Sequence, residues 1–274
     1  MSMGLSDVLW KRARSFPKIR IGVGAGVDVN SVVKSIEALR GVADFTIVSN
    51  RGLSCDFCKV LVCDCPEEVL VDLLWSGEVD ACVRGSLGAR SVLECLRKRF
   101  SVSELLRVSI LEFDSRPLLV APVGVDEGFS FEEKVRLVEA GVRLCGELGF
   151  PVKRIGLVSC GRLEDVGRCE YVDESIAELE LLKHKLIEKF SGLEVAHWGI
   201  VVEEAVKSSD LLVFWNGVLG NLFVRCLALL CGVRSFGAPI MGIEKVFVDT
   251  FRGRGGFIDA LLLAKALALA RLSK

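Results

Sequence analysis

Residues 79–88, VDACVRGSLG, indicate the fold class of this chain. Asp80–Arg84 is a short run of mostly small and apolar residues, which predicts a buried strand. The glycines and serine that follow predict a tight turn, and the pattern of Ala89–Arg99 predicts a helix. A buried strand that passes through a glycine turn into a helix is typical of a parallel sheet covered by helices.

The same alternation of strand and helix patterns continues on both sides of this segment. Each expected strand is short and apolar, and the helices between them show an apolar face. The expected strands are 18–24, 44–49, 59–63, 105–113, 117–122, 154–159, 197–201, 211–215, 235–241 and 246–250. The sequence therefore predicts an α/β protein with mostly parallel sheets, whose ligands should lie beyond the carboxyl ends of the strands.

Composition narrows the class of protein further. Hydrophobic residues make up 51% and charged residues 26%, and the mean hydropathy is +0.46, as in sheets buried on both faces. Basic and acidic residues nearly balance at 35 and 36, so no nucleic-acid partner is expected. No apolar run reaches the roughly 20 residues of a membrane span, and no secretory signal pattern is seen, so we expect a cytoplasmic protein without a membrane partner.

Eleven cysteines are scattered through the chain. Without a signal sequence, we expect them to be reduced and mostly structural. The alternative is a metal or redox site, because a C-x-x-C and a C-x-C follow each other closely. The weak candidate ligands are Cys55, Cys58, Cys63 and Cys65.

The loop after the first quoted strand has the features of an anion site. Arg84 supplies positive charge, and Gly85, Ser86 and Gly88 expose backbone N–H groups at the positive end of the following helix. The alternative is a tight turn that needs small residues for steric reasons only.

A second loop, Asn216–Asn221, combines glycines with amides. Gly217 and Gly220 allow close approach of a backbone, and Asn216 and Asn221 bring side-chain donors to a helix N-terminus. In the alternative interpretation Asn221 is only a helix cap.

A third loop is cationic. Arg252 and Arg254 stand among glycines after Asp249, and two guanidinium groups there can hold a phosphate bidentately. An ordinary solvated loop is the alternative.

Other polar residues give weaker signals. His184 lies between lysines and is expected on a solvated helix face, and His197 beside Trp198 is expected to serve packing. No G-x-S-x-G motif is present, so serine hydrolase chemistry is not expected. Ser159 follows a strand and is expected to contact a ligand.

Five segments in this order resemble the phosphate acetyl/butyryltransferase and phosphate acyltransferase superfamily, whose fold is similar to that of isocitrate dehydrogenase. They are Val79–Ser86, Arg154–Ser159, Asn216–Asn221, Gly237–Gly242 and Asp249–Gly253. Phe251 stands where the acetyltransferases carry a catalytic serine, while Arg252 matches their arginine. The acidic residue expected after it has no clear counterpart, since Ile258 falls there with Asp259 beside it.

The resemblance implies an outer domain of residues 1–115 plus 246–274 and an inserted middle domain of residues 116–245. It also implies a homodimer and a phosphate- or CoA-like ligand in the cleft between the domains. Arg252 and Asn221 are then the expected catalytic residues. The expected ligand-binding residues are Arg84, Gly85, Ser86, Gly88, Ser159, Asn216, Gly217, Gly220, Asp249 and Arg254.

Among divergent members, the length and cysteine usage are most similar to the short archaeal methyltransferase-related family used as a methanogenesis marker (MtxX-type). This resemblance implies methyl transfer linked to methyl-coenzyme M chemistry, with a methyltransferase partner protein. Three functions stay open: a transferase of methyl, acyl or phosphoryl groups, a binding or regulatory module without chemistry, and a redox or metal protein. No cofactor is identified by these patterns.

Overall fold

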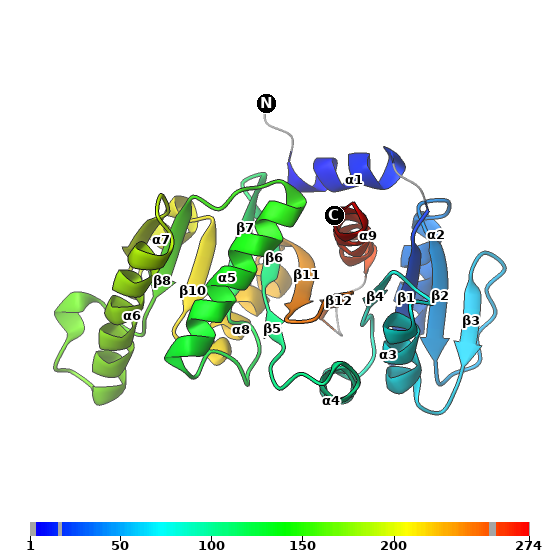
Figure 1. Cartoon of the computed structure of the whole chain (residues 1–274), viewed down its shortest axis with the longest axis horizontal. Helices are drawn as coiled ribbons and strands as arrows, with labels where there is room; N and C mark the ends of the chain where they lie inside the picture. Colours follow the sequence, from blue (N-terminus) through cyan, green and yellow to red (C-terminus); the bar gives the residue numbers. More distant parts are fainter. Residues whose placement is uncertain (1–3, 16–17, 252–255, 274) are drawn as a thin grey trace. The chain divides into compact units, whose positions relative to one another are not determined.

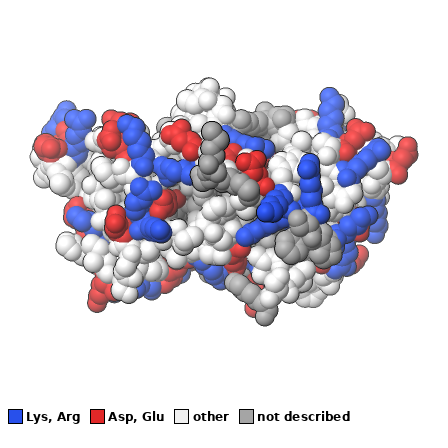
Figure 2. Space-filling view, turned by 90° about the horizontal axis from the view of Figure 1, so that it is seen from above, with Lys and Arg blue, Asp and Glu red and all other residues white. Residues whose placement is uncertain are grey.

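A computed structural model describes residues 4–15, 18–251 and 256–273, which divide into two compact units (Figure 1). Unit 1 comprises Met1–Leu105 with Ser235–Lys274, and unit 2 comprises Leu106–Arg234. Within each unit, helices pack against the strands of the sheet. Figure 2 shows Lys and Arg side chains mixed with Asp and Glu over the viewed face.

The sheet of unit 1 has the strand order β3-β2-β1-β4-β12-β11, with β11 antiparallel to β12 and the other pairs parallel. Its strands are β1 (Arg20–Ala25), β2 (Asp44–Ser49), β3 (Lys59–Val62), β4 (Ala81–Val83), β11 (Arg234–Met241) and β12 (Val246–Asp249). Its helices are α1 (Leu5–Ser15), α2 (Val29–Ala38), α3 (Pro66–Ser76), α4 (Ala89–Phe100) and α9 (Ile258–Leu272). Strand β4 is buried along its whole length, which explains its continuous run of small and apolar residues.

Helix α9 fastens three parts of unit 1 together. It contacts α1, α2 and the strands β1, β4 and β12. Lys265 of this helix is almost fully buried, and its Nζ donates to Ala13 O at 2.8 Å and to Val42 O at 2.5 Å. Burial lowers the pKa of Lys265, since its ammonium group meets carbonyl dipoles and no carboxylate is among these two partners.

The sheet of unit 2 has the strand order β6-β7-β10-β8-β9, antiparallel between β6 and β7 and otherwise parallel. Its strands are β6 (Ser109–Phe113), β7 (Arg116–Ala121), β8 (Arg154–Val158), β9 (Glu194–His197) and β10 (Leu211–Phe214), preceded by the short β5 (Leu106–Arg107). Its α-helices are α5 (Phe131–Leu148), α6 (Glu170–Lys189), α7 (Val202–Ser208) and α8 (Gly217–Arg225); η1 (Leu163–Asp165) is a single 3₁₀ turn, and η2 (Cys226–Leu230) continues α8 as a π-helical turn.

An ion pair of the same kind, between an arginine and an aspartate, lies at the amino ends of two neighbouring strands in each unit. In unit 1 the Arg20 side chain and backbone N–H donate to Asp80, and Asp80 N–H returns a bond to Arg20 O. In unit 2 Arg154 and Asp210 make the corresponding bonds. In both cases the arginine begins the central strand and the aspartate precedes the next parallel strand, which fixes the register of the pair.

The predicted α/β class with mostly parallel sheets is confirmed, with corrections to single elements. The strand expected at 197–201 is β9, which lies earlier and ends at His197, because Gly199 adopts φ +61° and turns the chain. Residues 59–62 form an edge strand rather than a buried one, and the first and last residues of this strand are exposed. The strand expected at 105–113 is interrupted and appears as β5 and β6.

The cysteine cluster of residues 55–65 also differs from expectation. Cys55 and Cys58 form a disulfide with Cα atoms 5.8 Å apart, a separation that the C-x-x-C spacing permits, so these two are not reduced thiols. Cys63 and Cys65 are free, and within the described residues no group of three or more His, Cys, Asp or Glu is arranged to hold a metal ion. In the part of the chain that the structure describes, no helix is both long and apolar enough to cross a membrane.

Candidate functional site

Three neighbouring strands of unit 1, β1, β4 and β12, end side by side and pass into loops that are hydrogen-bonded to one another. Gly26 N–H donates to Ser86 Oγ at 2.8 Å, and Ser86 N–H donates to Gly24 O at 3.1 Å. On the other side, Thr250 Oγ1 donates to Gly85 O at 2.8 Å. The predicted 84–88 loop is therefore held from both flanks.

The glycines of these loops make room for the chain itself. Gly85 has φ +59°, and a Cβ placed on it would lie 2.0 Å from Gly24 O. A Cβ on Gly24 would likewise lie 2.5 Å from Arg84 O. The space expected for a ligand at Gly85 is thus filled by the neighbouring loop, as the steric interpretation of this turn requires.

Arg84 was expected to bind an anion, but its charge is balanced inside the protein. The side chain is 4% exposed, and its guanidinium forms an ion pair with the carboxylate of Asp249. It also donates to the carbonyl oxygens of Leu87 and Thr250. Arg84 and Asp249 are brought together as predicted, but as partners that connect β4 to β12.

The feature of this loop that stays available to an anion is the start of α4. Gly88 is the N-cap residue, and no side chain of the described residues caps the helix there. Arg90, in the first turn, is largely exposed and donates to Glu94 at 2.9 Å. The N–H groups of a helix's first turn carry partial positive charge, so this end of α4 suits a negative group.

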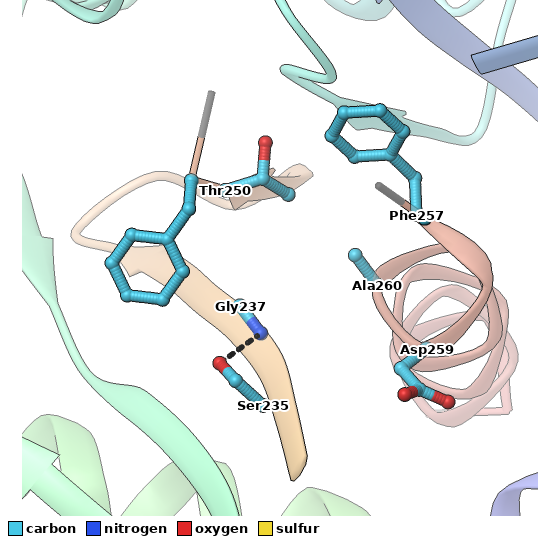
Figure 3. Close-up of a pocket in the computed structure, with 8 residues that line it drawn as sticks. Ser235, Gly237, Thr250, Phe257, Asp259 and Ala260 are labelled. Atoms are coloured by element: carbon cyan, nitrogen blue, oxygen red, sulfur yellow. Dashed lines mark hydrogen bonds between the residues drawn. The ribbon is translucent and has the colours of Figure 1, made fainter. Parts of the chain in front are cut away.

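A small cavity lies beside the end of β12 (Figure 3). Its labelled residues come from β11, from the end of β12 and from the start of α9, and its volume is about 40 Å³, room for a few water molecules. Phe251 and Asp259 both line it. Arg252 and Arg254, which follow in the sequence, lie outside the described residues.

In unit 2, the carboxyl ends of β7, β10, β8 and β9 are followed by more hydrogen-bonded polar side chains than the carboxyl ends of the unit 1 strands. Asn216 follows β10 and caps α8, with its Oδ1 accepting from Val218 N–H and Leu219 N–H, each at 3.1 Å. Asn221, which was expected to be catalytic or a cap, lies inside α8 and donates to Val123 O at 2.7 Å. This bond ties the helix to the loop after β7.

Gly217 and Gly220 explain why the 216–221 loop needs small residues. A Cβ on Gly217 would lie 1.6 Å from Gly124 O, and a Cβ on Gly220 would lie 2.0 Å from Pro122 O. Both glycines therefore bring α8 against the loop after β7, and neither presents an open surface to a ligand.

Sequence reasoning missed a chain of three polar side chains at this edge. Ser159 directly follows β8, His197 is the last residue of the adjacent β9, and Glu180 lies on α6, which connects these strands. His197 Nε2 lies 2.9 Å from Ser159 Oγ, and His197 Nδ1 lies 2.8 Å from Glu180 Oε1. His197 is thus not only a packing residue, and a serine–histidine pair exists without a G-x-S-x-G motif.

An ordered polar shell surrounds Ser159. Cys160 N–H donates to Ser175 Oγ at 3.0 Å, and burial raises the pKa of the Cys160 thiol in spite of hydrogen bonds from Ser175 and Tyr171. Tyr171 meets Trp215 edge to face, with ring centroids 4.5 Å apart. Asn216 Nδ2 reaches Tyr171 OH at 3.4 Å, so the start of α6 and the loop after β10 lie next to each other.

The side chain of Trp215 is held in place by a hydrogen bond to a buried ion pair. Lys134 is 1% exposed and its Nζ donates to Glu178 Oε1 at 2.7 Å, while Trp215 Nε1 donates to the other oxygen of Glu178. Ser159 and the Asn216–Asn221 loop are therefore brought to one edge of unit 2, and Arg84, Gly85, Ser86 and Asp249 to one edge of unit 1. That the two sets serve one pocket stays a prediction.

Solved structures with a similar fold define the class of protein. A branched-chain phosphotransacylase from Enterococcus faecalis matches with a TM-score of 0.71 at 16% identity, covering 91% of this chain and 99% of its own. A phosphotransacetylase from Streptococcus pyogenes matches with a TM-score of 0.71 at 12% identity, covering 97% and 99%. At such identities the likeness is one of fold, and the fold is the phosphotransacylase fold.

Relatives in sequence define the family. An uncharacterized methyltransferase of Methanopyrus kandleri is 40% identical over 260 residues, 91% of this chain and 99% of the relative. A Methanosarcina mazei protein, provisionally named methyltransferase mtx subunit X, is 37% identical over 211 residues, 77% of this chain and 74% of its own length. The chain belongs to this MtxX-type family of proteins named as methyltransferases. No family profile matches it.

Proposed function

We propose that the chain binds the anionic part of a carrier molecule, of the phosphate, CoA or coenzyme M type, at the carboxyl edge of the unit 1 sheet, and that it takes part in transfer of a methyl or acyl group. The observation that carries this proposal is the start of α4 at Gly88, where no side-chain cap is found among the described residues. The loop before it is held on both sides by hydrogen bonds to the loops after β1 and β12. N–H groups held in place can bind an anion without a further ordering cost.

Charge for such a ligand is available in the sequence next to this edge. Arg252 and Arg254 follow the end of β12, and β12 pairs with β4, the strand that leads into α4. Because the guanidinium of Arg84 is already paired with Asp249, we assign the ligand charge to Arg252 first. This assignment agrees with the arginine of the phosphate acyltransferase motif that the segment resembles.

The family name favours methyl transfer. Phe251 occupies the position of the serine in the acetyltransferases, and its side chain lines the cavity beside β12. Acyl transfer develops negative charge on a carbonyl oxygen, which a hydroxyl can stabilise. A methyl group has no such oxygen, so replacement of the serine by phenylalanine is compatible with methyl transfer.

A second function, ligand binding without chemistry, is favoured by the same residue. If Phe251 has replaced the reactive hydroxyl and nothing substitutes for it, the site would bind its ligand without reaction. The ligand-bound protein would then act by regulating a partner protein. We expect such a partner to be a methyltransferase subunit, since a relative is named as one subunit of an mtx methyltransferase. We also expect the chain to form a homodimer, which sedimentation analysis would test.

A thermal-shift experiment tests the anion site. Inorganic phosphate, CoA and coenzyme M would each be added to the wild type, to Arg252→Ala and to the control Arg143→Ala, whose exposed side chain lies on α5 of unit 2. A ligand at about 100 times its Kd contributes about 2.7 kcal/mol, which corresponds to a rise in melting temperature of about 5–10 °C. The proposal requires a rise in the wild type and control and a clearly smaller one in Arg252→Ala. Equal rises in all three would place the anion elsewhere.

A turnover assay separates the two functions. Acetyl phosphate and CoA would be incubated with the wild type and with Phe251→Ser, and acetyl-CoA would be measured. Formation by the wild type would show acyl transfer. Binding without turnover, with activity appearing only in Phe251→Ser, would support loss of acyl chemistry at this site.

A further inference from the structure

We propose that Ser159, His197 and Glu180 form a nucleophile–base–carboxylate triad in unit 2 that accepts an acyl group from an uncharged ester or a thioester. Ser159 is the nucleophile, His197 is the general base, and Glu180 is a positioning residue that orients the imidazole. This inference goes beyond the function proposed for unit 1. It rests on side chains of unit 2 alone, and it would stand if no anion bound at α4.

The geometry is that of a nucleophile activated by a neighbouring base. The two hydrogen-bond distances, 2.9 Å from Ser159 Oγ to Nε2 and 2.8 Å from Nδ1 to Glu180 Oε1, both lie within the range of catalytic triads. Ser159 directly follows β8, Glu180 lies on α6, and His197 is the last residue of β9. Since β8 and β9 are adjacent and parallel, their carboxyl ends place the serine and the histidine side by side.

The proton positions are determined by Glu180. Burial raises the pKa of the Glu180 carboxyl, but hydrogen bonds from His197 and Lys183 outweigh it, and the net shift is downward. An ionised carboxylate accepts only, so the imidazole hydrogen belongs on Nδ1. With the hydrogen on Nδ1, Nε2 is free to accept, and the single proton of the Ser159 hydroxyl has two acceptors within reach, Nε2 and Gly161 O, each at 2.9 Å.

Hydrogen-bond satisfaction alone does not explain this arrangement. Ser159 Oγ has a backbone acceptor, Gly161 O, at 2.9 Å, so the serine does not need the histidine as a partner. Ser175, a buried serine nearby, shows the ordinary case, in which the hydroxyl donates to Val172 O and accepts from Cys160 N–H. Ser159 differs from Ser175 because an imidazole nitrogen lies within hydrogen-bond distance of its hydroxyl, and the side chains of Ser159 and His197 are both 2% exposed.

The surroundings favour a carbonyl substrate. Near Ser159 lie the half-buried thiol of Cys160 and an aromatic pair made of the exposed Tyr171 and the half-buried Trp215, which together offer an apolar surface with hydroxyl and thiol groups. Such a surface suits an uncharged acyl chain. We therefore assign the substrate class as carboxylic esters or thioesters of small acyl groups.

The covalent step balances without a cofactor. Ser159 Oγ bonds to the carbonyl carbon while His197 Nε2 takes the hydroxyl proton, and the bond from that carbon to the alcohol or thiol breaks. His197 then gives the proton to the leaving alkoxide or thiolate. Cys160 N–H, which directly follows the nucleophile, would stabilise the oxyanion by exchanging Ser175 Oγ for the substrate oxygen. Water, activated by His197, releases the acid and restores Ser159.

Covalent labelling with a small alkyl fluorophosphonate tests the triad directly, because Ser159 Oγ would displace fluoride and gain the phosphonyl group. Intact mass and peptide mapping would locate the adduct in the wild type, with Ser175 as the internal control serine. We expect one adduct, on Ser159, that is absent in Ser159→Ala. An adduct on other residues only, or none when a known serine esterase reacts fully beside it, would overturn the proposal.

Variants of His197 and Glu180 test the separate roles of the base and of the positioning residue. His197→Gln should lower the inactivation rate constant by about 10²–10⁴-fold. Glu180→Gln should lower that rate constant without changing the half-saturating probe concentration or the melting temperature. The control Lys185→Gln, on the exposed face of α6, should leave all three quantities unchanged. Unchanged labelling of Ser159 in both His197→Gln and Glu180→Gln would show that the contacts are structural. Hydrolysis of p-nitrophenyl acetate and of acetyl-CoA would then distinguish an ester from a thioester substrate.

Discussion

The two units have the same kind of Arg–Asp ion pair at the amino ends of their strands and differ at the carboxyl ends. Arg20 with Asp80 in unit 1 and Arg154 with Asp210 in unit 2 make the same side-chain and backbone bonds in the same register. The strand orders also correspond, β2-β1-β4-β12 in one unit and β9-β8-β10-β7 in the other.

At the carboxyl ends the correspondence stops. In unit 1, strand β1 ends at Ala25 and its neighbour β2 ends at Ser49. In unit 2, Ser159 directly follows β8 and His197 ends the neighbouring β9. The edge of unit 1 is built from glycine turns and backbone bonds, with its buried arginine neutralised. The edge of unit 2 is built from side chains that can move protons. The comparison teaches that one scaffold supports a backbone surface suited to binding and a side-chain surface suited to chemistry.

The largest effect should come from the backbone-built edge. Gly85→Ala places a Cβ 2.0 Å from Gly24 O at φ +59°, so we expect loss of more than about 4 kcal/mol, measured by urea unfolding. Gly41→Ala is the matched control, since Gly41 has φ +81° with no atom near its Cβ, and should cost only about 1–2 kcal/mol. Similar losses in the two variants would mean that the loops after β1 and β4 are not closely packed.

Removal of one partner of the buried pair at the same edge should rank next. Arg84→Met leaves the Asp249 carboxylate without the guanidinium, and we expect a loss of about 3–5 kcal/mol in the free energy of unfolding. Arg90→Met, on the exposed start of α4, should have no measurable effect on stability. Adding Asp249→Leu to Arg84→Met should recover part of the loss, and failure to do so would show that the pair is not the source of the cost.

The shared amino-end device predicts the same pH dependence in both units. Burial raises the pKa of Asp80 and of Asp210, but hydrogen bonds from Arg20 and Arg154 give each a net downward shift. A carboxylate whose folded pKa is depressed stabilises the fold above its unfolded pKa of about 3.9, and this stabilisation is lost as the pH falls through the folded value.

Asp80→Asn and Asp210→Asn should therefore each cost about 2 kcal/mol at pH 7, with the cost shrinking as the pH falls below about 3.9. Unfolding curves at several pH values would measure it. A cost that is independent of pH, or present in one unit only, would break the equivalence of the two amino ends.

The helix starts give a smaller test. Asn216 caps α8 with two backbone bonds, so Asn216→Ala should cost about 1 kcal/mol in thermal or urea unfolding. A neutral result would mean that Tyr171 and Trp215, rather than the cap, fix this loop.

The smallest effect, a gain, is expected at the uncapped helix. Gly88→Asn would supply α4 with the cap that α8 already has, and its φ of −64° accepts any residue, so stability should rise by a few tenths of a kcal/mol. The same side chain would compete with an anion for the first-turn N–H groups. Weaker stabilisation of this variant by phosphate would support the proposed anion site, and unchanged stabilisation would contradict it.

Local features of the fold were predictable from sequence, and long-range pairings were not. Strand β4 and helix α4 lie where apolar periodicity placed them, because burial along a strand or on one helix face leaves a local pattern. The partner of Arg84 is 165 residues away, so its charge was assigned to a ligand. The triad joins residues 38 positions apart, and it was missed because the strand expected at 197–201 put His197 at the beginning of a strand, whereas His197 ends β9 beside Ser159.

The buried contacts of Lys265 have a consequence for the order in which the protein can form on the ribosome. Unit 1 is discontinuous, and its β11, β12 and α9 come from Ser235–Lys274, while Lys265 joins α9 to Ala13 and Val42 near the beginning of the chain. Unit 2 is continuous and can fold as soon as Arg234 has been translated. The first hundred residues must wait through its synthesis with an unfinished sheet, so in this protein the segment made first completes its structure last.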